Sequence, residues 1–443
     1  MTDSVDQHTG RTELSEEYEH TPVPPSARRG LLSVSAVWFG FPMNLGNAVF
    51  GGVIVYNLGL VRGLTAILIG NLVLFGYVGV LSHAAARTGE NFSLQAAGAF
   101  GARGRVIAAA FLATVVIGWF SFQIGLTGST LHQTLGWSTW TGAVVGGVVY
   151  TAVTVVGIRA LSLLGLVAVP LFVVLSGVAI GFGLQDGGTS LGGALSYGGA
   201  GHALSFGGAV GIVIAGFADS GTMTADFTRW AKDGRSGVIA TLCAFPFANG
   251  VAFGVGGIVV AIGGAVNPGV DGGGFLGLLA GHGPLLTAFA VLFVFANLGS
   301  VASHCLYNAA VGWSSITGVR MRPLAVALGL LGLLAALTGV WSSFLDWLNL
   351  LGVFVPPIGA VLVVDQIRRR RSPAPVPAGY RTAAFAAWAA GAALAGAAHW
   401  LAPGAADAVV GIAVAAAVFV LLSPRRAQAP EPAALPSASV PLG

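Results

Sequence analysis

The clearest chemical signal in this 443-residue chain is a single carboxylate, Asp219, within the apolar run at 204–228. It is the only Asp or Glu that we place at mid-depth of such a run. A charge buried there is costly, so its presence predicts a functional site by default. Asp219 would bind N–H donors or a positive group, or it would take up a proton. A structural hydrogen bond to a neighbouring segment is the alternative.

Trp119 and Gln123 form a second candidate pair. They are four residues apart, so they share one face of a helix. An indole plate beside an amide suits a flat, hydrogen-bonding ring, because the plate stacks and the amide reads the ring edge. The pair alone is a weak signal, since Trp is common in membrane proteins and Gln often bridges helices.

A third group, Asn297, Ser300, Ser303 and His304, recurs at helical spacing in the apolar run at 284–315. Side-chain oxygens at these positions could complete an oxygen cage for a small hard cation. His304 could instead carry protons, although a histidine satisfied between helices is the favoured interpretation.

The composition around these residues is that of a membrane protein. Hydrophobic residues make up 55% of the chain and charged residues 8%, and the mean hydropathy is +0.84. A soluble domain carries roughly 25% charged residues, and a soluble fold of this size could not cover its surface with so few. The composition excludes cytosolic enzymes, nucleic-acid binders and disordered proteins.

Twelve apolar segments are long enough to cross a bilayer, at roughly 20 residues each. They are uniformly apolar, which favours helices over the alternating strands of a β-barrel. We therefore predict an all-α polytopic membrane protein with twelve transmembrane helices. The segments lie near 31–57, 63–86, 104–131, 140–158, 161–184, 204–228, 236–264, 284–315, 322–341, 343–364, 382–402 and 405–423.

The basic residues predict the orientation. If both termini are cytoplasmic, 19 of the 20 Lys and Arg lie on the cytoplasmic side and only Arg62 lies outside, as the positive-inside rule requires. We predict a multi-pass protein of the cell (inner or plasma) membrane. Residues 1–30 form a disordered cytoplasmic tail, 31–424 the transmembrane domain and 425–443 a second tail. The net charge of +4 thus reports topology, and no nucleic-acid or obligate protein partner is indicated.

Two stretches should unwind their helices at mid-span, Gly40–Asn47 and Gly216–Thr222. Each combines glycine with proline or small polar residues, and unwound backbone is tolerated in a membrane only where it lines a cavity or binds a ligand. Breaks in the first and sixth spans predict two inverted repeats, spans 1–5 (31–184) and 6–10 (204–364), followed by spans 11–12 (382–423). Kinks that serve packing are the alternative.

The sequence resembles the nucleobase:cation symporter-1 family, and within it the bacterial cytosine permeases. The most specific match is Ser220-Gly-Thr-Met-Thr-Ala-Asp-Phe-Thr-Arg229, followed by Ala-Phe-Pro-Phe-Ala-Asn at 244–249. The resemblance covers roughly residues 30–425. It implies a leucine-transporter-type core of ten helices plus two more, alternating access, and uptake driven by sodium or protons.

The resemblance also implies a substrate site. Trp119 and Phe217 match the two aromatic plates that sandwich a planar ring, and Asn297 matches an amide that reads the ring edge. Val116 stands where cytosine permeases have a substrate-binding Gln, and Gln123 offers an amide one turn after Trp119 instead.

For the coupling ion, the resemblance places the backbone carbonyls of Gly40 and Met43 and the hydroxyl of Ser300 at a sodium site. Val301 falls at a second sodium hydroxyl, which weakens this cage and leaves proton coupling through Asp219 open. Asp219 itself replaces a serine that faces the substrate, so a ring with adjacent donors is expected rather than cytosine.

We predict a secondary active transporter that imports a nucleobase or a related planar nitrogenous heterocycle with Na⁺ or H⁺, and that uses no cofactor. The alternative is a carrier of a cationic or vitamin-precursor heterocycle, such as an aminopyrimidine, with Asp219 as counter-charge or proton site. No HExxH motif, paired mid-span carboxylates or nucleophile elbow indicates an enzyme. The predicted substrate-binding residues are Trp119, Gln123, Phe217, Asp219 and Asn297.

Overall fold

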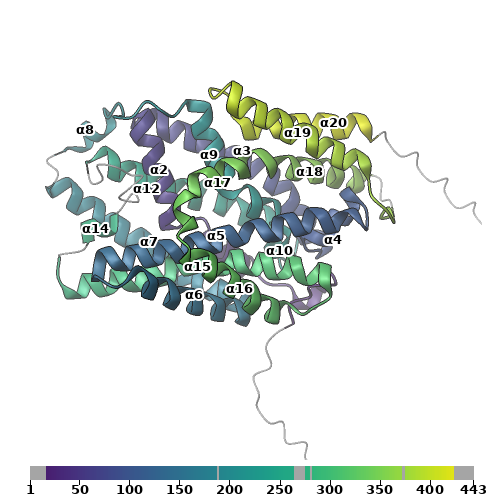
Figure 1. The fold of residues 1–443 in the computed structure, drawn as a ribbon, viewed down its shortest axis with the longest axis horizontal. Coiled ribbons are helices and arrows are strands. Elements are labelled where there is room, and N and C mark those ends of the chain that lie inside the picture. Colours follow the sequence, from purple (N-terminus) through teal and green to yellow (C-terminus); the bar gives the residue numbers. More distant parts are fainter. Residues whose placement is uncertain (1–15, 187–188, 264–274, 280–281, 372–374, 424–443) are drawn as a thin grey trace, which may run out of the picture.

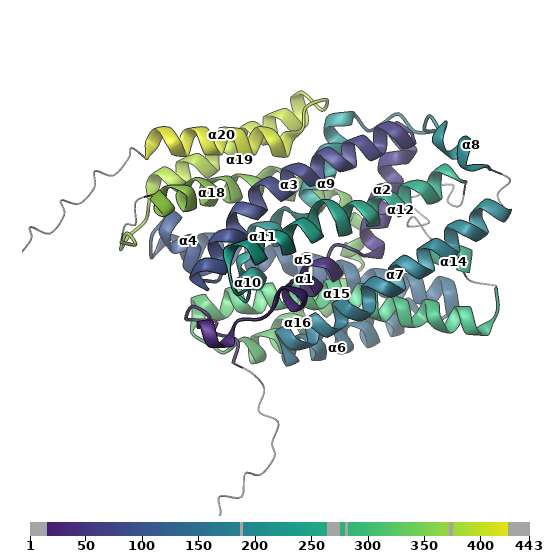
Figure 2. The same ribbon diagram turned by 180° about the vertical axis from the view of Figure 1, so that it is seen from behind.

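A computed structural model describes residues 16–186, 189–263, 275–279, 282–371 and 375–423. This part of the chain is helical and contains no strand beyond an isolated bridge between Arg29 and Ala231. Most helices run roughly along one axis, with α19 and α20 along one edge of the bundle and α6 and α16 along the opposite edge (Figures 1 and 2). The all-α prediction is confirmed for the described residues.

In the first half of the chain, the described residues form a 3₁₀ turn and eight helices. They are η1 (Pro25–Ala27), α1 (Leu31–Gly40), α2 (Leu45–Leu58), α3 (Leu60–Thr88), α4 (Phe92–Phe100), α5 (Gly104–Leu135), α6 (Thr139–Val156), α7 (Ile158–Asp186) and α8 (Leu191–Leu195).

The described residues of the second half are also helical. Its elements are α9 (Phe206–Thr222), α10 (Ala225–Thr228), α11 (Gly234–Leu242), the π-helical turn η2 (Cys243–Ala248), α12 (Asn249–Ala261), α14 (Phe275–Leu279), α15 (Pro284–Thr317), α16 (Met321–Leu337), η3 (Val340–Ser343), α17 (Phe344–Phe354), α18 (Pro356–Arg371), α19 (Thr382–Leu401) and α20 (Asp407–Leu422).

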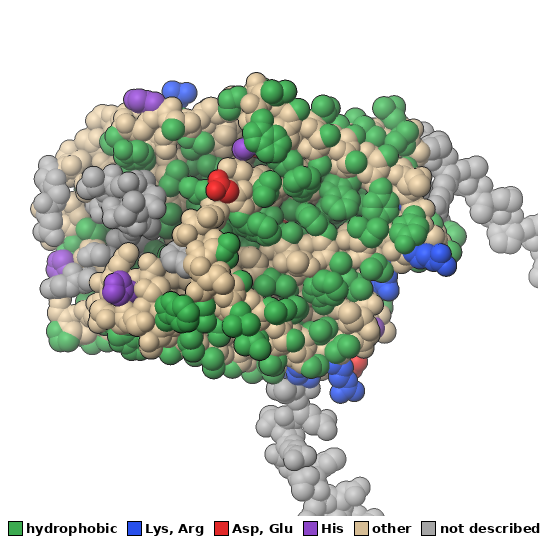
Figure 3. Space-filling model, viewed as in Figure 1, with side chains coloured by type: hydrophobic (Ala, Val, Ile, Leu, Met, Phe, Trp, Pro, Cys, Tyr) green, Lys and Arg blue, Asp and Glu red, His purple; other side chains and the backbone are tan. Residues whose placement is uncertain are grey.

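Eight helical stretches of the described chain are long and apolar enough to cross a membrane. The α1/α2 pair passes the same test as a ninth, although it is bent by 54°. Three shorter apolar helices, α9, α16 and α20, fall where further spans were expected. Figure 3 shows a broad hydrophobic surface between the two ends of the bundle, with most of the visible Lys and Arg at one end.

The first predicted helix break is present and the second is displaced. The residues at 41–44 separate α1 from α2, and this stretch holds Pro42, which cannot donate a backbone hydrogen bond. The expectation that Gly216–Thr222 unwinds is wrong. These residues complete α9, and the helix ends only at Met223 and Thr224, before α10.

Glycine serves close packing where these helices meet. In α2, a side chain on Gly51 would collide with the backbone of Phe253 in α12, and one on Gly256 of α12 would collide with the backbone of Ala48. Small residues let two membrane helices approach backbone to backbone. This contact fixes α2 against α12, and with it the end of the first break, where α2 begins.

Residues 17–29 form a segment that we call the N-terminal strap. It differs from the disordered tail expected for 1–30, of which residues 1–15 lie outside the described chain. The fully buried Arg229 donates to the backbone oxygens of Tyr18 (2.7 Å) and Glu17 (2.8 Å). The Glu17 carboxylate accepts from the Tyr307 hydroxyl at 2.9 Å. A buried guanidinium needs partners, and the strap supplies them.

Candidate functional site

The break between α1 and α2 is closed by side-chain amides. Asn44 caps α2 by accepting from the backbone N–H of Asn47 at 3.0 Å, and its own amide donates to the carbonyl of Phe41 at 3.2 Å. A cap of this kind satisfies donors and acceptors that have no partner at helix ends. Two helix ends therefore meet among buried residues.

Helix α15 holds the break from the other side. Asn297 accepts from the N–H of Leu45 at 2.8 Å and donates to the carbonyl of Met43 at 2.7 Å. The Ser300 hydroxyl donates to the carbonyl of Gly40 at 3.3 Å. The structure thus brings together the three residues predicted for the cation, and it uses both amide atoms of Asn297 on the backbone of the break.

A chain of asparagines ties the break to α12 and α3. Asn47 donates to Asn249 at 2.9 Å, Asn249 donates to Asn71 at 2.8 Å, and Asn71 donates to the carbonyl of Ile67. All three asparagines are buried. Sequence reasoning did not assign them a role, and the available signal was an amide in the middle of each of three apolar segments.

Gln123 of α5 faces the break. A side chain on Gly46, in the first turn of α2, would lie 3.6 Å from the Gln123 amide nitrogen. Gln123 is fully buried, and neither its amide oxygen nor its nitrogen has a hydrogen-bond partner among the residues that the structure describes. Buried polar atoms are normally paired, so an amide with both atoms open, next to a broken helix, indicates a ligand.

Trp119 and Asp219 meet one helical turn away. The Trp119 indole lies near the Asp219 carboxylate. Among the described residues, neither its N–H nor the second carboxylate oxygen of Asp219 has a hydrogen-bond partner. The first oxygen accepts from the backbone N–H of Ser220 at 2.6 Å. Asp219 therefore lies beside the predicted aromatic plate, with one oxygen available.

The two predicted plates belong to different aromatic clusters. Trp119 packs edge-on against Phe344 at a centroid distance of 4.6 Å, whereas Phe217 packs edge-on against Phe41 at 5.2 Å and Phe245 at 5.3 Å. Among the described residues, Trp119 and Phe217 are not in ring contact. Phe217 thus contacts Phe41 of the break, and Trp119 contacts Phe50 in α2.

His304 lies next to the break but is held there. Its ring stacks on Phe41 at 4.8 Å, and its Nδ1 is hydrogen-bonded to the backbone carbonyl of Ser300. Its Nε2 is buried and has no hydrogen-bond partner in the described part of the chain. The favoured interpretation of a histidine held between helices accounts for the stacking and for one ring nitrogen.

All of the predicted site residues are closed to solvent. Gly40 is buried, and none of the other seven has more than 4% of its surface exposed. The seven are Met43, Trp119, Gln123, Phe217, Asp219, Asn297 and Ser300.

An all-helical bundle of apolar helices, with one of them broken beside buried open polar groups, has the architecture of a membrane transporter. The chain belongs to the family of permeases for cytosine/purines, uracil, thiamine and allantoin, which it matches over residues 22–422. It is 30% identical over 355 residues to the cytosine permease of Escherichia coli O157:H7, covering 80% of this chain and 82% of the relative. The cytosine permease of Escherichia coli strain K12 is 29% identical over the same shares. The resemblance seen in the sequence is confirmed, and the protein is a transporter rather than an enzyme.

Solved structures share the fold. Mhp1, a nucleobase-cation-symport-1 family transporter in a closed conformation with bromovinylhydantoin bound, superimposes with a TM-score of 0.77 at 21% identity, covering 93% of this chain and 95% of that chain. A Na⁺-coupled sialic acid symporter in a substrate-bound outward-open state gives a TM-score of 0.66 at 12% identity, with 93% and 92% covered.

Proposed function

We propose that the protein is a secondary active transporter that imports a nucleobase or a related planar nitrogenous heterocycle together with a cation, by alternating access. The observation that carries this proposal is the buried Gln123 amide, open at both atoms beside the α1/α2 break. A heterocycle with adjacent donor and acceptor atoms would satisfy such an amide at both positions.

The other substrate contacts follow from the same geometry. Trp119 and Phe217 would line the two faces of the ring, and the open oxygen of Asp219 would accept a ring N–H. Asn297 would also contact the substrate. Because its amide is bonded to Met43 and Leu45, reading the ring edge requires it to release one of these backbone bonds when substrate enters.

For the coupling ion we favour sodium, bound by the carbonyls of Gly40 and Met43 and the hydroxyl of Ser300. Oxygen ligands of this kind suit a small hard cation. The Met43 carbonyl is also the acceptor of the Asn297 amide, so ion and substrate would act on the same break. Two ligands are coupled when both favour the same state. A proton on Asp219 is the alternative coupling ion.

We further propose that the eight long helices, the bent α1/α2 pair and the three shorter apolar helices together make twelve membrane crossings. They would form two inverted repeats of five spans and a C-terminal pair, in the cell membrane, with both termini in the cytoplasm. Residues 31–424 would then be the transmembrane domain and the ends of the chain cytoplasmic. The gathering of basic side chains at one end of the bundle supports this orientation (Figure 3).

A thermal-shift screen of the purified protein tests the proposal. Nucleobases, hydantoins and aminopyrimidines are each added in sodium and in choline buffer at fixed pH, because a ligand that binds only the folded state raises the apparent melting temperature. We expect one class to stabilise the protein, more strongly with sodium. The Trp119→Ala variant should lose this shift, whereas Trp137→Ala, in an exposed loop residue, should keep it. Normal ligand affinity in Trp119→Ala contradicts the proposed plate.

The open oxygen of Asp219 favours a second candidate, a carrier of cationic or vitamin-precursor heterocycles. A buried carboxylate would then be the counter-charge of the substrate. Asp219→Asn and Asp219→Ser variants separate the candidates. If Asp219 is a counter-charge, both variants should lose binding of cationic ligands and keep binding of neutral ones. If it is not, both should bind cationic and neutral ligands in the same ratio as the wild type.

A further inference from the structure

A groove of about 680 Å³ lies on the outside of the bundle, away from the helix break. It runs between α3, α11 and α18, which Figure 2 shows side by side. Its inner stretch is apolar, with Phe75 and Val80 of α3, Val238 of α11 and Ile367 of α18 among the lining residues. These side chains are exposed or half-buried, so the groove opens onto the hydrophobic surface of the protein.

The other end of the groove is basic. Arg87 at the end of α3 and Arg369 and Arg370 at the end of α18 line it, with Glu90 as the acidic group among the lining residues. Arg87 and Arg370 are exposed, and within the described chain neither guanidinium has an ion-pair or hydrogen-bond partner. We call this feature the arginine groove.

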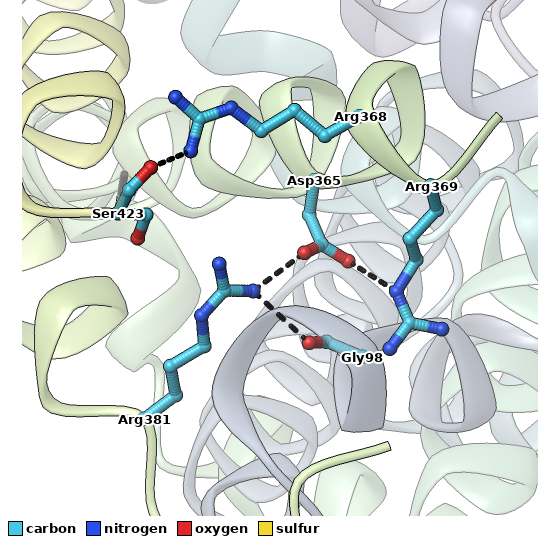
Figure 4. A network of polar contacts seen from close by, with 6 residues as sticks. All are labelled: Gly98, Asp365, Arg368, Arg369, Arg381 and Ser423. Carbon is cyan, nitrogen blue, oxygen red and sulfur yellow. Dashed lines mark hydrogen bonds and ion pairs between the residues drawn. The ribbon is translucent and has the colours of Figure 1, made fainter. Parts of the chain in front are cut away.

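The third arginine is held in place by a buried carboxylate. Asp365 pairs with Arg369 at 2.9 Å and with Arg381 at 2.6 Å, and Arg381 also donates to the carbonyl of Gly98 (Figure 4). One carboxylate is thus shared between two guanidinium groups. The end of α18 therefore keeps excess positive charge while Arg369 is fixed over the groove.

The spacing of the two ends fits an amphipathic ligand. Phe75 and Arg87 are twelve residues apart on α3, which is about 18 Å along a helix axis at 1.5 Å per residue. The arginine groove is apolar over this length and ends at unpaired arginines. It is therefore complementary to an acyl chain that carries a negatively charged head. Basic pockets between membrane helices are suited to anionic lipid head groups.

We propose that the arginine groove binds one anionic phospholipid, with an acyl chain along α3 and the phosphodiester at Arg87, Arg369 and Arg370. The lipid would bridge α3 and α11 to α18. This proposal does not depend on which substrate is transported. With the orientation proposed above, the lipid would lie in the cytoplasmic leaflet.

Native mass spectrometry of the full-length protein in detergent tests this. The probes are dioleoylphosphatidylglycerol, dioleoylphosphatidylcholine and inorganic phosphate. We expect one phosphatidylglycerol to be retained in preference to phosphatidylcholine. The double variant Arg87→Gln/Arg370→Gln should weaken phosphatidylglycerol binding about 30-fold, at roughly 1 kcal/mol for each basic residue. Arg103→Gln/Arg320→Gln, which replaces two exposed arginines that do not line the groove, is the matched control.

A second variant tests the apolar half and does not depend on charge. A Cβ atom at Gly76 would meet no atom within 4 Å, and Gly76 lines the groove, so Gly76→Phe places a ring in the groove. It should weaken both lipids, whereas Gly177→Phe on α7, also in open space, should weaken neither. Equal retention of the two lipids overturns the proposal, as does an arginine double variant that matches its control. Inorganic phosphate that competes as well as phosphatidylglycerol overturns it too, because the site would then bind a free anion.

Discussion

The chain leaves its helical path after Gly40 and again after Thr222, and the two breaks are held in different ways. The first spans four residues, bends the helix pair by 54° and is bonded by the amides of Asn44 and Asn297. The second spans two residues and leads into α10, where Arg229 is bonded to the N-terminal strap. The first break lies among the candidate site residues, and the second leads to the end of the bundle that the strap crosses.

The difference shows what forces a helix to break. Pro42 removes a backbone donor and Asn44 supplies a cap, so the first break is written into its own residues. Gly216 and Gly221 permit unwinding without requiring it. Gly221 lies where a side chain would meet Val78 at 2.9 Å and the Tyr77 hydroxyl at 3.2 Å, so it serves contact between α9 and α3.

Loss of the amide that holds the first break should have the largest effect. Asn297→Ala leaves the Leu45 N–H and the Met43 carbonyl buried without their partner, at ~1–3 kcal/mol each. We expect a stability loss of about 2–6 kcal/mol and a clearly lower melting temperature. Ser303→Ala is the control, because the carbonyl of Tyr150 that it bonds also accepts from Thr154. Equal losses in the two variants would show that α15 does not hold the break.

The link from the first break to α12 should contribute less. A double-mutant cycle on Asn47 and Asn249 isolates their 2.9 Å hydrogen bond and should give a coupling of ~1 kcal/mol in thermal unfolding. The Ser82–Thr241 pair, 2.7 Å apart between α3 and α11, provides a matched cycle away from the break. Similar coupling in both, with altered ligand binding only in the first, is expected. If ligand binding changed equally in the two cycles, the asparagine chain would have no specific role in the ligand site.

Local composition was enough to predict the all-helical class and the first break, because hydrophobic length and the Pro42–Asn44 pattern act over a few residues. The pairing of Gly40 with Ser300 followed from resemblance rather than from spacing. The asparagine chain was not predictable, since Asn47, Asn71 and Asn249 are far apart in the sequence and only packing joins them. The prediction that the N-terminal strap is disordered was wrong for the same reason, because its partners are distant in the sequence. Its acidic, proline-containing composition is typical of disorder, whereas the partner of Glu17 lies 290 residues away.

Docking of the N-terminal strap beside the second break should depend on pH. Burial raises the pKa of the Glu17 carboxyl above its ordinary 4.5, and the Tyr307 hydroxyl and Arg229 oppose this only in part. A carboxyl with a higher pKa when docked favours docking in its protonated form. Strap docking is therefore strongest below the ordinary pKa and weakens as the pH rises through the raised one. Hydrogen exchange of residues 18–29, compared with Glu17→Gln at each pH, measures this. Glu17→Gln should flatten the dependence and Glu19→Gln should keep it, so a wild-type profile parallel to that of Glu17→Gln would remove Glu17 as its source.

The smallest effect should come from two glycines, one in each of the two stretches that the sequence predicted to unwind. A side chain at Gly216 meets only Phe253, at 3.9 Å, so Gly216→Ala fits within α9 and should stabilise the protein by up to ~1 kcal/mol through helix propensity. A side chain at Gly46 lies 3.1 Å from the Asn44 side-chain oxygen and 3.2 Å from Phe122, so Gly46→Ala should not gain and should weaken ligand binding beside Gln123. Thermal unfolding and ligand-induced shifts of both variants separate them. If Gly216→Ala were the damaging one, α9 would have to unwind at Gly216 during the transport cycle, and the two breaks would be alike after all.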